Sequence, residues 1–330
     1  MLVTGGAGYI GAHMLIALKR AGEATVAVDD LSAGRREMAQ SASEFVVADI
    51  ADRALIQKLL IDAKVTEVIH FAGLTLVPES VERPLDYYAG NTAATIALLQ
   101  ACVTAGVERF IFSSSASVYG APEQSPVNES SAIHSISPYG ASMAMSERIL
   151  EDTARAYGLS FMILRYFNVA GADPGGRAGQ IGKPTHLVRV AAQIATGARE
   201  GPLKIYGADY PTPDGTAIRD YVHVSDLADA HLSALSYLRA GGASDILNVG
   251  YGRGYSVSEV IDAFERVTGK PMPHEIAPRR PGDPAQLIAD NAAIRASLDW
   301  RPRYDEIDFI VKTAILWEER LAKLTRGTAA

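Results

Sequence analysis

Short apolar runs alternate with segments of helical periodicity through the first half of the chain. The apolar runs predict strands at residues 1–4, 24–28, 45–47, 67–71, 109–114 and 160–166. Apolar positions spaced three or four residues apart predict helices at about 9–21, 52–63, 90–105 and 138–157. Strands and helices that alternate in this way form a parallel, doubly wound α/β sheet. Ligands bind beyond the carboxyl ends of such strands, so we expect the residues there to line one cleft.

The pattern changes after Asn168. Residues 171–184 are rich in glycine, proline and polar side chains, and a helix is predicted at about 185–197. Two further proline-containing loops follow at 207–216 and 278–284. This change in texture indicates a second, smaller part of the chain that is rich in loops.

We therefore predict two domains. The first covers residues 1–168, and a smaller α/β domain that contacts substrate covers residues 169–330. Residues at about 219–240 are expected to pack back on the first domain, so that the boundary is interleaved.

Composition and charge exclude several classes of protein. The 330 residues carry a net charge of −7, which argues against binding to nucleic acid or to an anionic membrane surface. No apolar run approaches the roughly 20 residues of a membrane span. The first strand begins at Met1, so we expect no signal peptide. Cys102 is the only cysteine and lies in a predicted helix, which indicates a buried packing residue, no disulfide within the chain and a cytoplasmic location. The seven histidines show no metal-ligand spacing, and we predict no metal site.

A glycine-rich turn follows the first strand. Residues 4–11 read Thr-Gly-Gly-Ala-Gly-Tyr-Ile-Gly, and a predicted helix begins at Tyr9. Gly5 is expected to form the tight turn, Gly8 to let the backbone approach phosphate, and Gly11 to let helix and strand pack closely. The first helical N–H groups, at Tyr9 and Ile10, are then free to bind an anion. This order of elements predicts a Rossmann-type dinucleotide site.

The second strand ends in Asp29, 18 residues after Gly11. A carboxylate at this place can accept hydrogen bonds from the adenosine ribose, and it would repel a 2′-phosphate. NAD is therefore expected in preference to NADP, although Arg35 and Arg36 lie close behind. The ends of the neighbouring strands should line the same cleft, and they supply Asp49, Ile50, Phe71, Ala72, Gly73 and Ser113.

Further motifs carry a family resemblance over almost the whole chain. They include Phe-Ala-Gly-Leu at 71–74, Pro-Glu-Ser-Val at 78–81, Pro-Leu-Asp-Tyr-Tyr at 84–88, Ser-Ser-Ser-Ala-Ser-Val-Tyr-Gly at 113–120, Ser-Pro-Tyr-Gly at 137–140, Arg-Tyr-Phe-Asn at 165–168, residues 214–224 and Arg-Arg-Pro-Gly-Asp-Pro at 279–284. With these motifs the chain resembles the extended short-chain dehydrogenases/reductases, and within them the family of UDP-glucose (UDP-galactose) 4-epimerases. The resemblance implies a homodimer built on paired helices of the first domain.

The resemblance also implies the roles of individual residues. Tyr139 would take the proton of the sugar 4-hydroxyl, and Ser115 would hydrogen-bond both groups. The C4 hydride would pass to NAD and return on the other face of a 4-keto sugar, so that C4 is inverted. Asn91 and Tyr166 would lie near the cofactor. The UDP-sugar would contact Ser115, Tyr139, Asn168, His186, Leu187, Tyr206, Arg219, Arg280, Asp283 and Leu287. Guanidinium groups suit a diphosphate because they donate paired hydrogen bonds to phosphate oxygens.

One catalytic position departs from the family pattern of Tyr-x-x-x-Lys, because Met143 stands four residues after Tyr139. In the family, this lysine binds the nicotinamide ribose and lowers the tyrosine pKa. A free tyrosine titrates near pH 10, so only about 0.1% is ionised at pH 7. Reaching neutrality needs roughly 4 kcal/mol, of which the positive nicotinamide ring can supply a part.

Three explanations of Met143 stay open. It is an engineered substitution, or a natural residue in an enzyme that works slowly or at high pH, or the mark of a protein that binds UDP-sugar and NAD without turnover. A nucleotide-sugar 4,6-dehydratase is disfavoured, because that chemistry adds an acidic pair beside the catalytic serine or threonine and Ala116 and Ser117 stand there. Leu287, at the position that closes over the sugar C2 substituent, leaves UDP-hexose, UDP-N-acetylhexosamine and UDP-hexuronate open.

Several other polar residues have a simple structural interpretation. His186 is either a helix cap or a diphosphate contact. Ser113 and Ser114 are expected to form hydrogen bonds at the strand end, and Tyr119 to pack. His70 and His223 are expected to be buried core histidines.

Overall fold

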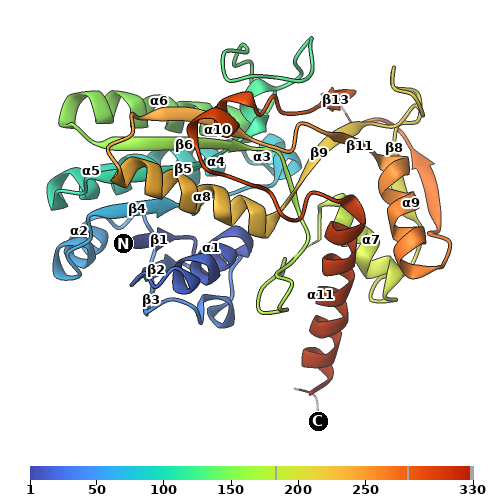
Figure 1. Ribbon diagram of the computed structural model, residues 1–330, viewed down its shortest axis with the longest axis horizontal. Coiled ribbons are helices and arrows are strands. Elements are labelled where there is room, and N and C mark those ends of the chain that lie inside the picture. Colours follow the sequence, from blue (N-terminus) through green and yellow to red (C-terminus); the bar gives the residue numbers. More distant parts are fainter. Residues whose placement is uncertain (183, 281, 328–330) are drawn as a thin grey trace.

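The computed structural model describes residues 1–182, 184–280 and 282–327. Its main feature is a parallel sheet of seven strands in the order β10-β6-β5-β4-β1-β2-β3 (Figure 1). The strands are β1 (Leu2–Thr4), β2 (Val26–Asp29), β3 (Glu44–Val47), β4 (Glu67–His70), β5 (Arg109–Ser115), β6 (Ser160–Tyr166) and β10 (Asp245–Val249). The doubly wound α/β fold predicted from the alternating pattern is confirmed.

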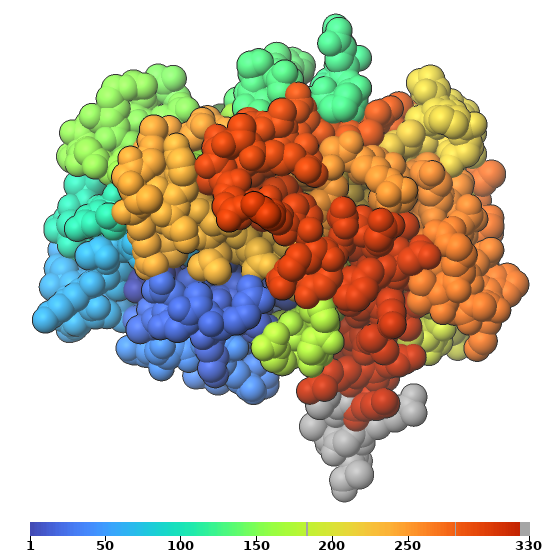
Figure 2. All heavy atoms as spheres, in the orientation of Figure 1, coloured from blue at the N-terminus to red at the C-terminus, as the bar shows by residue number. Residues whose placement is uncertain are grey.

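Both faces of this sheet are covered by helices. In β5, Phe110 and Phe112 belong to one hydrophobic core, whereas Ile111 belongs to the other, because successive side chains of a strand point to opposite faces. The first core is closed by helices α2 (Arg53–Asp62), α5 (Ala94–Ala105) and α6 (Pro138–Tyr157). The second is closed by α1 (Tyr9–Arg20), α8 (Val224–Arg239) and α10 (Ala292–Ser297). Figure 2 shows the second face, where α8 lies against α1.

The strand order reverses between β1 and β4, which are neighbours in the sheet although they are distant in sequence. In open α/β sheets, ligands bind beyond the carboxyl ends of the strands at such a switch point. The glycine turn after β1 and the segment 71–73 after β4 both lie there. The topology therefore places the predicted cofactor residues at one site.

The smaller lobe contains a second sheet and a two-stranded ribbon (Figure 1). The sheet consists of β7 (Asn168–Ala170), β9 (Ile218–His223), β11 (Gly254–Ser256) and β13 (Gln286–Leu287). In the ribbon, β8 (Leu203–Tyr206) pairs with β12 (His274–Ala277). Three helices pack around these strands, namely α7 (Leu187–Ala195), α9 (Val257–Thr268) and α11 (Ile307–Gly327).

The expected segment 219–240 is divided between the two sheets. Within this segment, α8 packs on the first sheet, whereas β9 belongs to the second. Strand β10 was not predicted, and it extends the first sheet beside β6. The division at residue 168 itself stays a prediction.

One predicted helix has a different form. Residues Tyr88–Ala93 are π-helical, and regular α5 starts only at Ala94. Two short helices that were not predicted precede it, α3 (Val77–Glu82) and α4 (Pro84–Tyr87). A π-turn inserts an extra residue and redirects the side chains around it. Here it brings Asn91 towards the cleft. In the described parts of the chain, no helix has the length and apolar character that crossing a membrane requires.

Four histidines lie in the core, including the two for which this was predicted. Their exposed fractions are at most 2%, and they are His13, His70, His223 and His231. Desolvation by burial lowers the pKa of His70 and His223 to about 3 and that of His13 and His231 to about 4. The folded protein therefore keeps these rings neutral at pH values where an unfolded chain binds protons.

The free energy of unfolding is expected to fall as the pH drops through about 6.5 towards 4. Protons bind the unfolded chain first, so each buried histidine costs up to about 1.4 kcal/mol per pH unit in that range. Urea titrations near pH 7 and near pH 5 measure the loss. Replacing His70 by asparagine should reduce the slope, whereas replacing the exposed His274 by glutamine should not. A free energy that is flat across this range would contradict the assignment.

Candidate functional site

The glycine turn forms a close-fitting cradle. Gly5 has a φ of +66°, and a Cβ atom there would lie 2.7 Å from the backbone nitrogen of Ala72. A Cβ atom on Gly11 would lie 2.1 Å from the Gly5 carbonyl oxygen. Neither position can carry a side chain without moving backbone, so the turn packs tightly on the start of α1 and on the segment after β4. The roles predicted for Gly5 and Gly11 agree with this geometry.

The start of α1 is open to a ligand. Gly8 is the N-cap residue, and among the described residues no side chain caps this helix end. The first N–H groups of α1 therefore remain free for an anion. The side chain of Tyr9 turns away and donates to the Gly171 carbonyl at 2.6 Å, so Tyr9 can offer the cofactor only its backbone N–H. The cradle fits a dinucleotide pyrophosphate.

Asp29 lies at the end of β2 with 7% of its surface exposed. Its Oδ2 accepts from the Ala7 N–H at 3.0 Å and its Oδ1 from the Leu31 N–H at 2.8 Å. Burial raises the pKa of this carboxyl, and the backbone hydrogen bonds oppose that rise. Each oxygen keeps a further lone pair that can accept from a ribose hydroxyl. Asp49 and Ile50, which were also expected to contact the cofactor, differ in their exposure: Asp49 is exposed and Ile50 is buried.

Asn91 holds the wall of the cleft after β4. Its Oδ1 accepts from the Leu74 N–H at 2.7 Å, and its Nδ2 donates to the Leu74 carbonyl at 3.0 Å. The same Nδ2 donates to Ser142 Oγ on α6 at 3.0 Å. The residue that was expected near the cofactor therefore ties residues 73–75 to the helix that carries Tyr139.

Tyr139 lies in the first turn of α6 with 5% of its surface exposed. Burial raises the pKa of its phenol, and the neighbouring Ser115 hydroxyl, at the end of β5, acts in the opposite direction. The structure therefore brings together the two residues that were predicted to act on the sugar hydroxyl. Met143 follows one helical turn later and is also buried, with 7% exposed.

Tyr166 and Ser113 lie beside this pair. Burial raises the pKa of Tyr166, the nearby Tyr139 raises it further, and the Ser113 hydroxyl lowers it. The side chains that contribute to the pKa of Tyr139 include no cation. The chain itself therefore supplies less help to ionise Tyr139 than a lysine at position 143 would.

A buried ion pair lies further along α6, two helical turns after Tyr139. Arg165 donates to Glu147 through Nε at 3.0 Å and through Nη2 at 2.7 Å, and both side chains are at most 3% exposed. Glu147 also accepts from Ser114 Oγ at 2.5 Å. Arg165 donates to the Tyr119 hydroxyl, which donates to Asn248 at 2.7 Å. The predicted hydrogen bonding of Ser114 and packing of Tyr119 are confirmed, whereas the buried Ser113 hydroxyl has no hydrogen-bond partner among the described residues, so that prediction is wrong for Ser113.

The second lobe supplies a cationic group of residues. Arg219 on β9 forms a salt bridge with Asp283, and the Arg280 guanidinium lies 3.8 Å from the centre of the Tyr206 ring. Leu287 on β13 is the direct pairing partner of Arg219. These five predicted substrate residues come from three separate segments and lie in one region. Pro281, in the motif at 279–284, is outside the described residues.

This group lies next to the approach to Tyr139. A Cβ atom on Gly282 would lie 3.3 Å from the side chain of Ile136, which precedes Tyr139 by three residues. Asn168 begins β7, directly after Tyr166 and Phe167, and pairs with Tyr221 of β9. These contacts bring the second lobe beside the segment that leads to Tyr139.

His186 occupies the N-cap position of α7, but its side chain forms no cap hydrogen bond. Its Nδ1 instead lies 2.6 Å from Gln180 Nε2, and the side chain is exposed. The cap interpretation is therefore wrong for the side chain, and the diphosphate contact stays a prediction. Leu187, the next residue, begins α7.

Sequence reasoning missed Asp220, which is fully buried on β9. Its carboxylate accepts from the N–H groups of Tyr251, Gly252 and Ala289, at 2.9, 2.9 and 3.3 Å. Burial raises its pKa to about 6, and these three hydrogen bonds oppose the rise. Successive residues of a strand point to opposite faces, so Asp220 must face away from the side on which Arg219 lies. A charged residue directly after Arg219 was therefore the signal in the sequence for a buried carboxylate.

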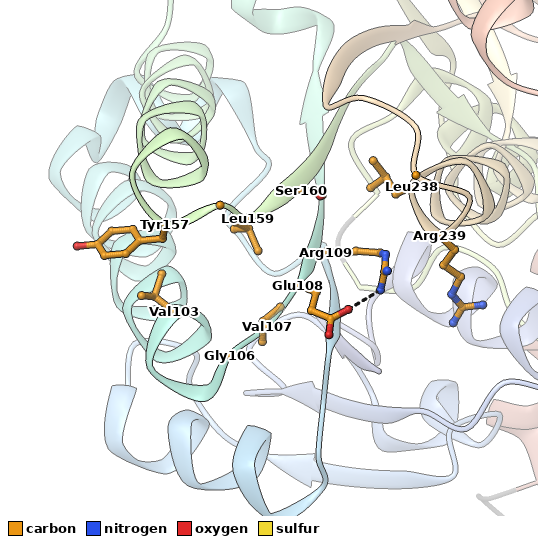
Figure 3. Close-up of a pocket in the computed structure, with 12 residues that line it drawn as sticks. Val103, Gly106, Val107, Glu108, Arg109, Tyr157, Leu159, Ser160, Leu238 and Arg239 are labelled. Atoms are coloured by element: carbon orange, nitrogen blue, oxygen red, sulfur yellow. Dashed lines mark hydrogen bonds and ion pairs between the residues drawn. The ribbon is translucent and has the colours of Figure 1, made fainter.

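A separate hollow of about 560 Å³ lies at the amino ends of β5 and β6 (Figure 3). Its wall includes Arg109, Glu108, Tyr157 and Leu159. Arg109 is already paired with Glu108 at 2.9 Å and with Glu67 at 3.4 Å. This is the edge opposite to the glycine turn, so the hollow is not part of the candidate active site. Within the described residues, no cluster of three His, Cys, Asp or Glu side chains could hold a metal ion.

Comparison with known proteins agrees with this site. Residues 1–250 match the NAD dependent epimerase/dehydratase family. The chain is 54% identical over 322 residues to a UDP-glucose 4-epimerase from Azospirillum brasilense, which covers 97% of this chain and 92% of that protein.

Two solved structures are similar over nearly the full length. UDP-glucose-4-epimerase from Stenotrophomonas maltophila, with bound NAD and formylated UDP-arabinopyranose, has a TM-score of 0.94 and 38% identity, with 98% of each chain covered. UDP-glucose 4-epimerase from Bifidobacterium longum, in complex with NAD+ and UDP, has a TM-score of 0.90 and 37% identity, with 97% of this chain and 98% of that chain covered. This chain therefore belongs to the NAD dependent epimerase/dehydratase family.

Proposed function

We propose that this protein is a UDP-sugar 4-epimerase that interconverts UDP-galactose and UDP-glucose. The observation that carries the proposal is the buried Tyr139–Ser115 pair between a dinucleotide cradle and a cationic group from the second lobe. The relatives named above are UDP-glucose 4-epimerases, and they support the same activity.

The chain's residues would act on the sugar as follows. Tyr139 takes the proton of the sugar 4-hydroxyl and later returns it, and Ser115 orients both groups by hydrogen bonding. When bound, NAD supplies a reversible acceptor for the C4 hydride, which passage through a 4-keto sugar requires. The cofactor would be held by the cradle at Gly5 to Gly11 and by Asp29.

The nucleotide part of the substrate suits the second lobe. Arg219 and Arg280 offer guanidinium groups to the diphosphate. Asp283 holds Arg219 in place by a salt bridge, and the Tyr206 ring supports the Arg280 guanidinium. Leu287, paired with Arg219, would face the sugar C2 substituent, so UDP-N-acetylhexosamine and UDP-hexuronate are alternative substrates.

Met143 sets the pH range in which the enzyme works. Without a neighbouring cation, Tyr139 is ionised only at high pH, because burial raises its pKa. We therefore expect a natural, active enzyme whose turnover increases with pH.

Turnover of UDP-galactose by the NAD-loaded protein, followed by NMR near pH 7 and near pH 9.5, tests the proposal. Formation of UDP-glucose that is several times faster at the higher pH is expected. Absence of product at both pH values, with NAD retained, would reject this substrate. It would leave another UDP-sugar, or a protein that binds without turnover.

We further propose a homodimer in the cytoplasm. Large apolar side chains are exposed on neighbouring helices of the first domain, namely Val81 on α3, Leu85, Ile96 on α5 and Met145 on α6, with exposed fractions of 63%, 79%, 38% and 47%. These helices pack on one another, so the side chains can form one apolar surface (Figure 1). A second copy that covers it would remove this area from water. The single buried cysteine, Cys102, supports a reducing compartment.

The mass in solution should be twice the 35.1 kDa of one chain. Light scattering after gel filtration measures it. The double substitution Ile96→Asp and Met145→Asp should give monomers, because charged side chains oppose burial. Ile276→Asp, at a more exposed apolar side chain in the other lobe (69% exposed), is the control and should leave the mass unchanged. A monomeric wild-type protein would contradict the dimer.

A further inference from the structure

The Tyr87 side chain hydrogen-bonds to the backbone of the loop that follows β4. This loop, residues 72–76, starts against Gly5 of the cofactor cradle. The Tyr87 hydroxyl accepts from the Leu76 N–H at 3.0 Å, and its one proton is shared between the Leu76 carbonyl oxygen at 2.8 Å and Glu79 Oε2 at 2.9 Å. Leu74 lies two residues before Leu76 in the same loop. Its backbone N–H and carbonyl are bound in the same manner by the side chain of Asn91. Two side chains thus fix the cofactor-side wall of the cleft.

The same two side chains reach the catalytic helix. Asn91 donates to Ser142 of α6, and the Tyr87 ring meets the Tyr139 ring edge to face, with centroids 6.3 Å apart and planes at 83°. Tyr87 is fully buried and Tyr139 nearly so, with exposed fractions of 0% and 5%. An edge-to-face contact of this kind fixes the tilt of both rings. Tyr87 is therefore in contact with both the cofactor-side loop and the catalytic phenol.

Tyr87 is not itself a candidate for proton transfer. Burial raises the pKa of its phenol, and a hydrogen bond with Glu79 Oε2, at 2.9 Å, raises it further. It stays neutral at the pH values at which the protein would work, so it acts as a fixed donor and a rigid ring.

We propose that Tyr87 is a positioning residue that sets Tyr139 relative to the cofactor-side loop for proton transfer. The inference rests on the proposed 4-epimerase function. Proton transfer is steeply sensitive to geometry, since a displacement of about 1 Å can cost about 100-fold in rate. Met143 cannot supply the polar contact that a lysine would make at this place, so the Tyr87 link carries more of the alignment.

The rate of NAD reduction in the first turnover, read from absorbance at saturating UDP-galactose, tests this. Tyr87→Phe keeps the ring and loses the grip on Leu76, and it should slow the reaction about tenfold with little change in KM. Tyr87→Leu also loses the ring contact and should slow it about 100-fold. Tyr88→Phe, at the next residue, is the matched control and should stay within about twofold of the wild type. All variants are compared at equal NAD content and well below their unfolding temperatures.

A second measurement does not depend on turnover. The ionisation of Tyr139 is followed by ultraviolet absorbance in the NAD-loaded protein. The titration curve of each protein is corrected by subtracting the curve of the same protein with the added substitution Tyr139→Phe, so that only the signal of Tyr139 remains. In Tyr87→Phe the midpoint should rise by about half a unit or more, because Tyr139 loses its alignment with Ser115, whose hydroxyl lowers its pKa.

The outcomes separate the two proposals. A wild type without turnover would reject the proposed function, and the titration would still test Tyr87. The positioning role would be overturned by a folded Tyr87→Phe variant whose rate and titration midpoint both equal those of the wild type. If the wild type shows no turnover, an unchanged titration midpoint in Tyr87→Phe would be enough to overturn it. A lower unfolding temperature with no change in rate or midpoint would show that Tyr87 serves stability alone.

Discussion

Replacing Met143 by lysine is expected to raise turnover of UDP-galactose at pH 7 by about 10- to 1,000-fold. The physical reason is the charge state of Tyr139. Burial raises the pKa of its phenol, and only the Ser115 hydroxyl opposes this rise. An ammonium group one helical turn away lowers the pKa of such a neighbour by about one to three units. Each unit gives about ten times more phenolate at neutral pH.

The pH dependence of kcat gives a more specific test than the rate alone. In Met143→Lys, the rising limb should move to lower pH by the same one to three units, about 1.4 kcal/mol for each. Met143→Leu keeps the size and adds no charge, so it should follow the wild type. If Met143→Lys folds, retains NAD and shows neither the faster rate nor the shifted limb, the pKa of Tyr139 does not limit the reaction.

Breaking the Glu147–Arg165 pair is expected to cost about 3–5 kcal/mol of unfolding free energy. Both side chains are almost completely buried. Burial works to lower the pKa of Arg165, but the hydrogen bonds and charge of Glu147 outweigh it and raise the pKa. Arg165→Met would leave the Glu147 carboxylate in the core without its cation, and Glu147→Leu would do the reverse.

The double variant separates the free energy of the ion pair from the free energy of packing of the two side chains. Glu147→Leu with Arg165→Met removes both charges, so its cost should be well below the sum of the two single costs. Urea unfolding of the four proteins measures the cycle. Additive costs would mean that the two side chains stabilise the fold independently of each other. The surface pair Arg148–Asp152 on the same helix is the control, since its exposed side chains are worth at most about 1 kcal/mol.

The first half of the fold was predictable because its signals are local. The six predicted strands and the turn at Gly5 depend on runs of a few residues, and these runs fix both the type of element and its face. The proximity of Tyr139 and Ser115 was predictable for another reason. Tyr139 and Ser115 lie in motifs that carry a family resemblance, and the structure brings the two side chains together.

The features that were missed depend on distant partners. Glu147 is a polar residue in a helix, which by itself indicates a solvent-facing position, and only Arg165 on β6 explains its burial. Strand β10 is a short apolar run whose place beside β6 is decided by packing. The π-helical turn at Tyr88–Ala93 depends on the bonds that Asn91 makes to Leu74 and Ser142. No periodicity in the sequence carries this information.

The fate of the hydrogen at C4 tests the central claim most directly. UDP-galactose labelled with deuterium at C4 is incubated with the NAD-loaded protein above pH 9, and the product is examined by NMR. The proposed epimerase should yield UDP-glucose that retains the deuterium at C4, because the hydride leaves and returns within one bound complex. In Tyr139→Phe the rate should fall by about 100- to 10,000-fold. Product that has exchanged its label with water, or wild-type protein that gives no product under these conditions, would contradict the account.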